Sequence, residues 1–435
     1  MAEVANIAKI PELRNRLLFT VLMLGIYRIG IYVPTPGINA AELSRFLAQG
    51  TVFDIFNLFS GGALEQFSVF ALGIMPYISA SIIFQLMAVA VPAVERLSKE
   101  GDAGRQKITQ YTRYATVLLS LIQGFGISFG LASQGMVLPG IGGPIFYLTT
   151  VLTLASGTVF LMWLGEIITE RGIGNGISMI IFAGIVARIP SGFRDAWDAK
   201  EQYAGFFGFL MLIAFVALIM GCIIYMERAQ RRIPIHYAKR VVGRKIYGMQ
   251  SSHLPLKVNP AGVIPPIFAS AILLFPTTIA QFAQKNETLK VVATILTTGW
   301  VYTALYVTMI IFFTYFYTAV VFNPVDVAEN LKKHGGFVPG IRPGKATADH
   351  IDKILSRILL GGALYIATVC VLPTFLIHQF GIPASLAFTF GGTSMLIVVG
   401  VGMDTLAQIE SHLLSRHYEG FMGAKTGGRF RGRRG

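Results

Sequence analysis

One apolar segment, residues 59–86, restricts the fold of this chain more than any other. It reads FSGGALEQFSVFALGIMPYISASIIFQL, which is too long for one membrane span and is interrupted by Gly73 and Pro76. Before the interruption, residues 63–72 would form a helix only about 15 Å long, half of a hydrocarbon core of roughly 30 Å. Irregular backbone at membrane depth is tolerated only where protein buries it or where it lines a watery cavity. The segment therefore predicts a protein that encloses a pore or cavity.

The composition places the chain in the membrane. Of its 435 residues, 54% are hydrophobic and 13% are charged, which fits neither a soluble enzyme nor a disordered chain. Ten segments are apolar and near the roughly 20 residues that a spanning helix needs. We expect these spans at residues 17–33, 73–94, 114–132, 146–164, 173–189, 206–226, 263–282, 300–322, 354–377 and 383–403.

The positive charges predict the orientation of these spans. Cytoplasmic loops retain an excess of Lys and Arg, and 29 of the 36 such residues fall on one side of the ten spans. Both termini are therefore expected in the cytoplasm. The first apolar run has spanning length and no small-residue cleavage site follows it, so we expect it to remain as a helix rather than to be removed as a signal peptide.

The ten spans divide into two sets of five around a loop near residues 194–203. An odd number of spans per half gives the halves opposite orientations, which permits inverted repeats with a binding or conducting site between them. We expect an N-terminal half at residues 1–192, a C-terminal half at 193–410 and a basic cytosolic tail at 411–435. The halves share no evident sequence echo, so ten helices without internal symmetry remain an alternative.

Few ionisable residues lie inside the predicted spans. Arg28 lies in the first span, Glu166 near a cytoplasmic end and Asp404 at the end of the last span. Ion-coupled transporters need a charge partner for their ion at membrane depth, so the sequence favours a passive channel and keeps a secondary transporter as the alternative. Arg28 is either a functional cation or a residue that pairs with a nearby carbonyl or snorkels to the membrane surface.

No catalytic or cofactor site is predicted. Ser178 has no histidine at membrane depth to activate it, and the GIRPGKA sequence around Lys345 lacks the first glycine and the Ser or Thr of a phosphate loop. Cys222 and Cys370 fall in different spans, which favours core packing over a disulfide or a metal site. We expect no enzyme activity, no metal and no cofactor.

Isoleucine and small polar residues follow the interruption. Ile74 and Ile78 flank Pro76 on one helix face. Narrow apolar constrictions hold back water and ions by dewetting, so these residues suit the wall of a pore. Composition alone favours the alternative, in which they are ordinary lipid-facing or packing residues.

Several sequence segments resemble the SecY/Sec61-alpha family of protein-conducting channel subunits. They read FSGGAL with FALGIMPYISASII, EGDAGRQKITQYTRY, FLMWLGEIITERGIGNGIS, HLPLKVNPAGVIPPIFAS, VFNPVDVAENLKKHGGFVPGIRPG and FGGTSMLIVV, and they occur in the family's order. The resemblance implies an all-α clamshell of two inverted five-helix halves around an hourglass pore. It implies a channel in the bacterial cytoplasmic membrane that passes unfolded, signal-bearing polypeptides and releases transmembrane segments sideways into lipid.

The resemblance also assigns the centre of that pore. A plug would occupy residues 60–72 as the predicted half-helix, with Ser60, Gly61, Gly62, Ala63, Leu64, Phe67, Phe70 and Leu72. The ring of apolar side chains at the constriction maps onto Ile74, Ile78, Ile177, Ile181, Ile267 and Ile397. Branched aliphatic side chains need no hydrogen bond and are bulky enough that a few can close around an extended polypeptide.

A lateral gate is implied between the second and seventh spans, with the third and eighth beside them. Candidates for its polar seam are Ser79, Ser81 and Gln85 on one side and Ser270 on the other, with Gln123 on the third span. Interhelical hydrogen bonds in membranes contribute only about 0.6 to 2 kcal/mol each, so such a seam can open.

Two cytosolic loops, near residues 228–258 and 323–353, are predicted to bind partners. In the first, β-branched and aromatic residues on either side of a turn at Gly243 predict a basic hairpin. In the second, Asn323-Pro324 starts a short helix and the stiff loop PGIRPG follows it. The resemblance implies contacts with the motor ATPase SecA or the ribosome through Arg342, Arg244 and Lys245, and we add Arg231 and Arg232. Enforcement of topology is the alternative role for any single basic residue.

Further partners follow from the same resemblance. It implies the small membrane subunits SecE and SecG, besides signal peptides, nascent polypeptides and membrane lipid. The tail KTGGRFRGRRG departs from the family pattern. Its interleaved Arg, Gly and Phe can bind RNA without sequence preference, whereas a disordered tail that follows the positive-inside rule is the favoured alternative.

Overall fold

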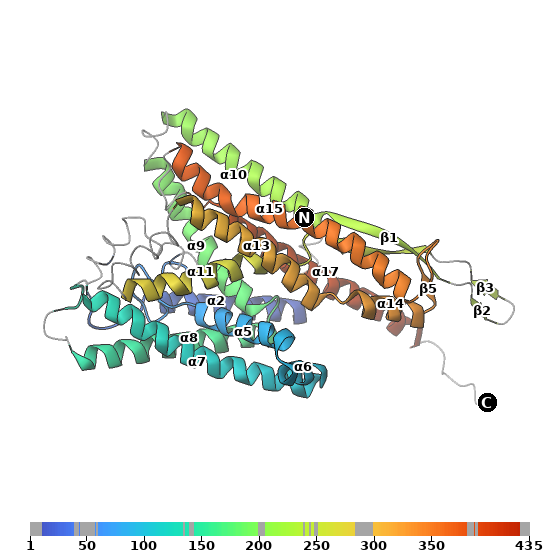
Figure 1. Ribbon diagram of the computed structural model, residues 1–435, viewed down its shortest axis with the longest axis horizontal. Helices are drawn as coiled ribbons and strands as arrows, with labels where there is room; N and C mark the ends of the chain where they lie inside the picture. Colours follow the sequence, from blue (N-terminus) through green and yellow to red (C-terminus); the bar gives the residue numbers. More distant parts are fainter. Residues whose placement is uncertain are drawn as a thin grey trace, which may run out of the picture.

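Long helices form a bundle with a small β-structure at one end, as the computed structural model shows (Figure 1). The structure describes residues 11–38, 43, 57, 60–133, 135–138, 143–198, 205–237, 240–242, 245–247, 251–282, 299–380, 387 and 390–426. The helices are α2 (Pro11–Ile31), α5 (Met75–Ala90), α6 (Pro92–Lys99), α7 (Asp102–Ser133), α8 (Pro144–Arg171), α9 (Gly176–Asp198), α10 (Gly205–Arg228), α11 (Ile264–Phe282), α13 (Gly299–Val321), α14 (Pro324–Lys333), α15 (Lys345–Phe380) and α17 (Gly392–Thr426). The strands are β1 (Gln230–Tyr237), β2 (Arg240–Val242), β3 (Lys245–Tyr247), β4 (Ser251–Lys257) and β5 (Gly336–Phe337).

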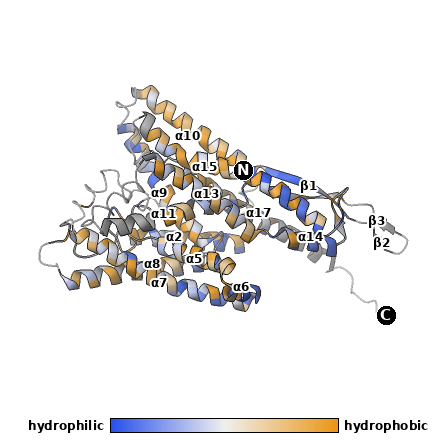
Figure 2. Cartoon of the chain, in the orientation of Figure 1, coloured by the Kyte–Doolittle hydropathy of each residue, from blue (hydrophilic) through white to orange (hydrophobic). Residues whose placement is uncertain are grey.

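Each of the ten predicted spans contains a helix. Within the described residues, seven helices are long and apolar enough to cross a membrane, and α5 together with α6 would make an eighth. Helix α11 contributes a shorter apolar stretch, Ile264–Leu273. Apolar residues run along the long helices, whereas hydrophilic residues gather on α6 and β1 (Figure 2). The prediction of a polytopic all-α membrane protein is confirmed.

The second span is shorter than the sequence predicts. We expect it over residues 73–94, but α5 ends at Ala90 and α6 starts at Pro92, with a bend of 98° between them. Val91 at the bend is extended, because the ring of the following proline disfavours helical conformation in the residue before it.

Two predicted domain boundaries fall inside helices. Helix α9 contains Pro190 and continues to Asp198, past the boundary at 192/193, since neighbouring helices can compensate for a proline in a spanning helix. Helix α17 continues to Thr426, past the predicted start of the tail at 411. This stretch contains Leu, Arg, Glu, Met, Ala and Lys, which are good helix formers. The last nine residues, 427–435, lie outside the described residues.

The helices pack in two groups of five. Helices α2, α5, α7, α8 and α9 contact one another, as do α10, α11, α13, α15 and α17. The groups meet along two lines, where α17 packs on α9 and where α11 packs on α5 and α7. One large cluster of buried apolar side chains contains residues of both groups. The division into groups follows the two halves that the sequence predicts.

The predicted basic hairpin is confirmed. Strand β1 pairs antiparallel with β4, and β2 pairs antiparallel with β3, the strand that follows it in the sequence. Gly243 itself lies outside the described residues. Strand β5 adds to the other edge of β1, with His236 opposite Phe337. The two loops that the sequence predicts to be cytosolic and treats separately are therefore joined in one sheet.

The predicted short helix after the eighth span is also confirmed as α14. The Asn323 side chain accepts a hydrogen bond from the Val325 amide at 3.0 Å, which satisfies one of the free amides at the helix start. Gly335 follows the helix with a φ of 72°, a conformation that glycine adopts without steric cost.

Gly176, at the start of α9, lies against the backbone of α8. A Cβ there would overlap the carbonyl oxygen of Gly165 and lie 2.8 Å from Cβ of Ile168. We expect Gly176→Ala to destabilise the protein by about 1–3 kcal/mol, the usual cost of overpacking. Thermal unfolding in lipid nanodiscs measures this effect. Gly25→Ala in α2 is the control, because a Cβ at Gly25 meets no atom within 4 Å; equal melting temperatures of the two variants would contradict the packing.

Candidate functional site

The isoleucines predicted to line a constriction belong to one large hydrophobic cluster that includes residues of both helix groups. Five of them are buried in the large hydrophobic cluster, with exposed fractions between 1% and 7%: Ile74, Ile78, Ile181, Ile267 and Ile397. Ile177 is partly buried and packs against the same cluster. They come from the start of α5, from α9, from α11 and from α17. Because the first five are buried, they do not face lipid. Two roles remain for them, namely packing in the core or lining the wall of a pore.

The interruption in the sequence fixes where α5 begins. Gly73 has a φ of 56°, and a Cβ there would lie 3.3 Å from Cα of Ser60. Ile74 is the cap residue before the helix, and Pro76 occupies its first turn, where a missing amide proton does no harm. The amide of Ile78 donates to the Ile74 carbonyl at 3.1 Å. Both isoleucines thus stand at the end of a helix rather than in its middle.

Residues 60–72, the plug segment, are not the predicted half-helix. They form consecutive turns, in which the amides of Ala63, Phe67 and Ala71 each donate to the carbonyl three residues earlier. Phe67 has a φ of 43°, and Gly61 and Gly62 have φ values of 67° and 92°. Left-handed residues end a right-handed helix, so the turns cannot merge into one.

The plug segment is nevertheless buried at the centre of the bundle. Among the residues predicted to form it, Ser60, Gly61, Ala63, Leu64, Phe67, Phe70 and Leu72 are buried and Gly62 is partly buried. The Phe70 ring stacks between Tyr27 of α2 and Phe160 of α8, with ring centroids 6.2 and 5.7 Å away.

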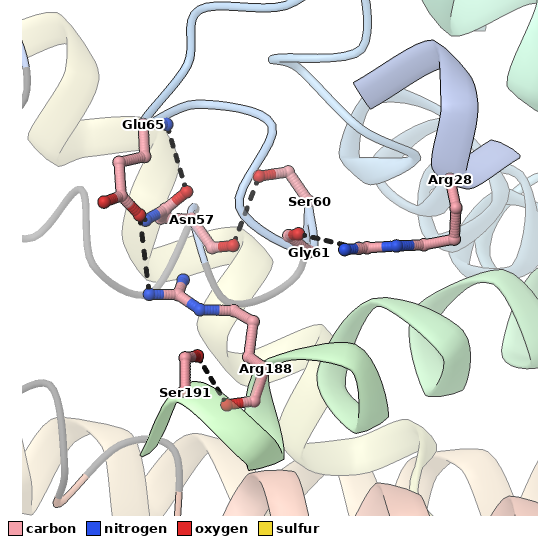
Figure 3. Close-up of polar contacts among 7 residues, drawn as sticks. All are labelled: Arg28, Asn57, Ser60, Gly61, Glu65, Arg188 and Ser191. Atoms are coloured by element: carbon pink, nitrogen blue, oxygen red, sulfur yellow. Dashed lines mark hydrogen bonds and ion pairs between the residues drawn. The ribbon is translucent and has the colours of Figure 1, made fainter. Parts of the chain in front are cut away.

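Helix α2 supplies polar partners for the backbone of the plug segment. The Tyr27 hydroxyl donates to the Ser60 carbonyl at 3.0 Å, and Nη1 of Arg28 donates to the Gly61 carbonyl at 3.1 Å (Figure 3). This geometry confirms the interpretation that Arg28 pairs with a nearby carbonyl. Just after α2, the amide of Thr35 donates to the Phe67 carbonyl at 2.9 Å.

Helix α9 closes the other side of the plug segment. The backbones of Gly61 and Gly184 are in contact, since a Cβ at Gly184 would lie 3.0 Å from Cα of Gly61. One turn further along α9, Arg188 forms an ion pair with Glu65 at 3.7 Å. Sequence reasoning missed Tyr27, Gly184 and this ion pair. The only signal was that Glu65 is the sole charged residue of the plug segment.

The residues predicted for a lateral gate lie on α5, α7 and α11, and α11 packs on both of the other helices. Their hydrogen bonds, however, run along single helices. Gln85 donates to Ser81 at 3.1 Å within α5, and Ser270 donates to the Ile267 carbonyl at 2.9 Å within α11. Ser79 is partly buried, and Oε1 of Gln123 is buried without a partner among the described residues. The structure shows no hydrogen bond between helices for this set within its described part.

The other contact line between the helix groups includes polar contacts as well as apolar packing. Oε1 of Gln408 in α17 accepts a hydrogen bond from the Gly174 amide at 2.8 Å, in the loop between α8 and α9. The Thr405 hydroxyl lies 3.5 Å from the sulfur of Met179 in α9. The sequence gave no indication of this link, because the two residues of the hydrogen bond are 234 positions apart.

Three predicted partner-binding arginines lie at the sheet end of the molecule. Arg231 and Arg232 are exposed on β1, and Arg342 is exposed in the loop that follows β5. The carbonyl of Arg342 accepts a hydrogen bond from the Thr347 hydroxyl at 2.9 Å, which holds the loop against the start of α15. Arg244 and the side chain of Lys245 lie outside the described residues.

Neither cysteine forms a disulfide. Cys370 is buried and Cys222 is exposed on α10. Within the described ranges, no three His, Cys, Asp or Glu side chains cluster as metal ligands would.

Comparisons with known proteins agree with this architecture. A sequence model of the SecY family matches residues 68–406. The protein translocase subunit SecY of Pseudomonas aeruginosa is 51% identical over 420 residues, which are 95% of this chain and 94% of that protein. A solved SecY, whose plug domain is described as stabilizing the closed state of the translocation channel and maintaining a membrane seal, covers 95% of this chain and 97% of its own, with a TM-score of 0.66 and 17% identity. Sec61 in the canine ribosome-channel complex has the same coverage, with a TM-score of 0.62 and 16% identity.

The contact between Gly184 and Gly61 predicts that a larger residue displaces the plug segment. We expect Gly184→Val to expose Leu64, which is 3% exposed in the native structure. A single cysteine at position 64, with Cys222 and Cys370 changed to Ser, should then react several-fold faster with a water-soluble maleimide. Gly221→Val is the matched control, because a Cβ at Gly221 meets no atom within 4 Å. Unchanged labelling in the Gly184→Val protein would contradict the packing.

Proposed function

Because the chain belongs to the SecY family, we propose that it is the channel subunit of a protein translocase. It passes unfolded, signal-bearing polypeptides across the bacterial cytoplasmic membrane and releases transmembrane segments sideways into lipid. The observation that carries this proposal is the convergence of six isoleucines from both helix groups on one buried cluster beside the plug segment. The protein moves its substrate without making or breaking covalent bonds in it.

The isoleucines suit the narrowest part of the channel. Aliphatic side chains offer no hydrogen bond to water, so a constriction lined by them empties of water and blocks ions without a charged gate. Ile74 and Ile78 belong to one helix group, and Ile267 and Ile397 to the other. A small separation of the groups would therefore widen the ring enough for an extended chain, and the isoleucines would still contact that chain.

The plug segment suits a seal that must be removable. It is buried, yet its backbone is held by a few single hydrogen bonds, from Tyr27, Arg28 and the backbone just after α2, rather than by a helix of its own. Turns held by side chains can leave their site as a unit when a polypeptide enters. The net contribution of each such hydrogen bond is only about 0.5–3 kcal/mol.

The line where α11 meets α5 and α7 suits a lateral gate. Ser81, Gln85 and Ser270 are hydrogen-bonded within their own helices, so separating the helices breaks none of these bonds. The cost of opening is then mainly lost packing, which lipid or an apolar signal helix can replace.

The basic sheet suits contact with cytosolic partners. Arg231, Arg232 and Arg342 are exposed on parts of the chain that one sheet joins, so a SecA motor or a ribosome could contact them together. Sec61 in the canine complex is bound to a ribosome. In the proposed orientation this end of the molecule faces the cytoplasm, and both termini lie on the same side. The small subunits SecE and SecG complete the proposed complex.

Asparagine in place of the ring isoleucines should make the closed channel leak. We expect Ile74→Asn and Ile397→Asn each to raise ion conductance several-fold, because a polar side chain hydrates the constriction. Planar-bilayer recordings of the reconstituted protein measure this. Ile83→Asn is the control on the same helix, since Ile83 is 44% exposed. Native conductance in both ring variants, in protein that still imports a signal-bearing precursor, would contradict the assigned constriction.

Reversal of charge at Arg342 should weaken partner binding. We expect Arg342→Glu to lower the affinity for SecA or ribosomes about tenfold, because complementary charges steer and hold such complexes. Binding to the protein in nanodiscs is measured at low and high salt. Arg105→Glu, on an exposed residue of α7, carries the same charge change on the other helix group. An equal loss in both variants would indicate a general effect of charge instead of a contact at Arg342.

A further inference from the structure

We propose that the ion pair between Glu65 and Arg188 is a latch that positions the plug segment and sets how readily a signal sequence opens the channel. This inference rests on the proposed function. It adds that the strength of this ion pair determines the stringency of the channel, that is, how strictly it rejects a precursor with a defective signal sequence.

The two charges meet on the side of the plug segment that faces α9. Oε2 of Glu65 lies 3.7 Å from Nη2 of Arg188, and the two side chains point toward one another (Figure 3). Arg188 is held on α9, one turn beyond Gly184, which contacts Gly61. The plug segment is thus attached to α2 on one side and to α9 on the other.

Glu65 is oriented for this contact before the pair forms. Buried Asn57 accepts a hydrogen bond from the Glu65 amide at 3.2 Å and donates from Nδ2 to the Glu65 carboxylate at 3.3 Å. An ion pair between exposed side chains contributes little when both must be immobilised. Here the carboxylate is already positioned, so less conformational entropy is lost when Arg188 binds it.

The pair differs in kind from the other polar contacts of the plug segment. Tyr27 and Arg28 donate to backbone carbonyls, so these bonds involve no side chain of the plug segment. Within the described part of the chain, Glu65–Arg188 is the only polar contact recorded between a side chain of the plug segment and a side chain of a long helix. Its strength therefore depends on the identity of both residues and can be tuned by substitution.

The exposure of the pair allows it to open. The Glu65 side chain is 50% exposed and that of Arg188 is 24% exposed. Water and salt reach both charges, so separating them avoids the large cost of leaving a buried charge unpaired. Salt should weaken the latch, since exposed charges are screened. A polypeptide that displaces the plug segment has only to break a weak, well-placed contact on this side.

The test uses Glu65→Gln, Arg188→Gln and the double exchange of Glu65→Arg with Arg188→Glu. Each is made in the full complex with a single cysteine at position 64. Labelling of that cysteine by a water-soluble maleimide reports the position of the plug segment without any transport. Import of a precursor with a defective signal sequence reports stringency. Arg194→Gln is the matched control, because Arg194 is an exposed arginine on the same helix.

We expect each single variant to raise labelling and import of the defective precursor about two- to five-fold, the range for a partly exposed pair. The double exchange should return both towards native values, which a purely structural role would not do. High salt should raise labelling of the native protein and leave that of Glu65→Gln unchanged. Native labelling and stringency in both single variants, while a normal precursor is imported, would overturn the latch. No import of the normal precursor by the native complex would instead overturn the proposed function.

Discussion

The structure depends on how irregular backbone is satisfied at the centre of a membrane bundle. Lipid offers no partner for an amide or carbonyl group, so each must find one in the protein or in enclosed water. Residues 60–72 meet this demand with short turns and with donors from α2, among them Arg28, which lies in the predicted first span and bonds a backbone carbonyl. The arginine is therefore explained by the backbone that it satisfies, and it need not bind an ion.

The same constraint accounts for the aliphatic character of the proposed ring beside the plug segment. Once the plug segment satisfies its polar groups internally and through α2, the surface beneath it needs no further donors. Ile74 and Ile397, each 1% exposed, can then pack at the centre without leaving a polar atom unpaired. In the proposed channel, an uncharged constriction and a plug segment with internally satisfied polar groups are two consequences of one requirement. A charge in this region would need its own partner and would bind the polypeptide that has to pass.

The sequence predicted those features that depend on local chemistry. Each of the ten spans predicted from hydropathy contains a helix, the Asn323 cap located α14, and the broken run at Gly73 and Pro76 located the start of α5. It failed where distant contacts decide conformation. The apolar run at 63–72 is typical of a helix, yet tertiary contacts hold it in turns with Phe67 left-handed. Likewise, no local pattern pairs Glu65 with Arg188 or Gly174 with Gln408, because such pairs exist only after the helices pack.

The two lines of contact between the helix groups should respond differently to force from a substrate. At α9 and α17, separation would remove the Gln408 partner of the Gly174 amide, and a polar group left unpaired away from water costs about 1–3 kcal/mol. Where α11 meets α5 and α7, the polar side chains of the seam keep their intrahelical partners, and an apolar substrate segment can replace the lost packing. The molecule should therefore part along α11 while the contact at α17 holds, so the exit that opens first is the one through which an apolar segment can reach lipid.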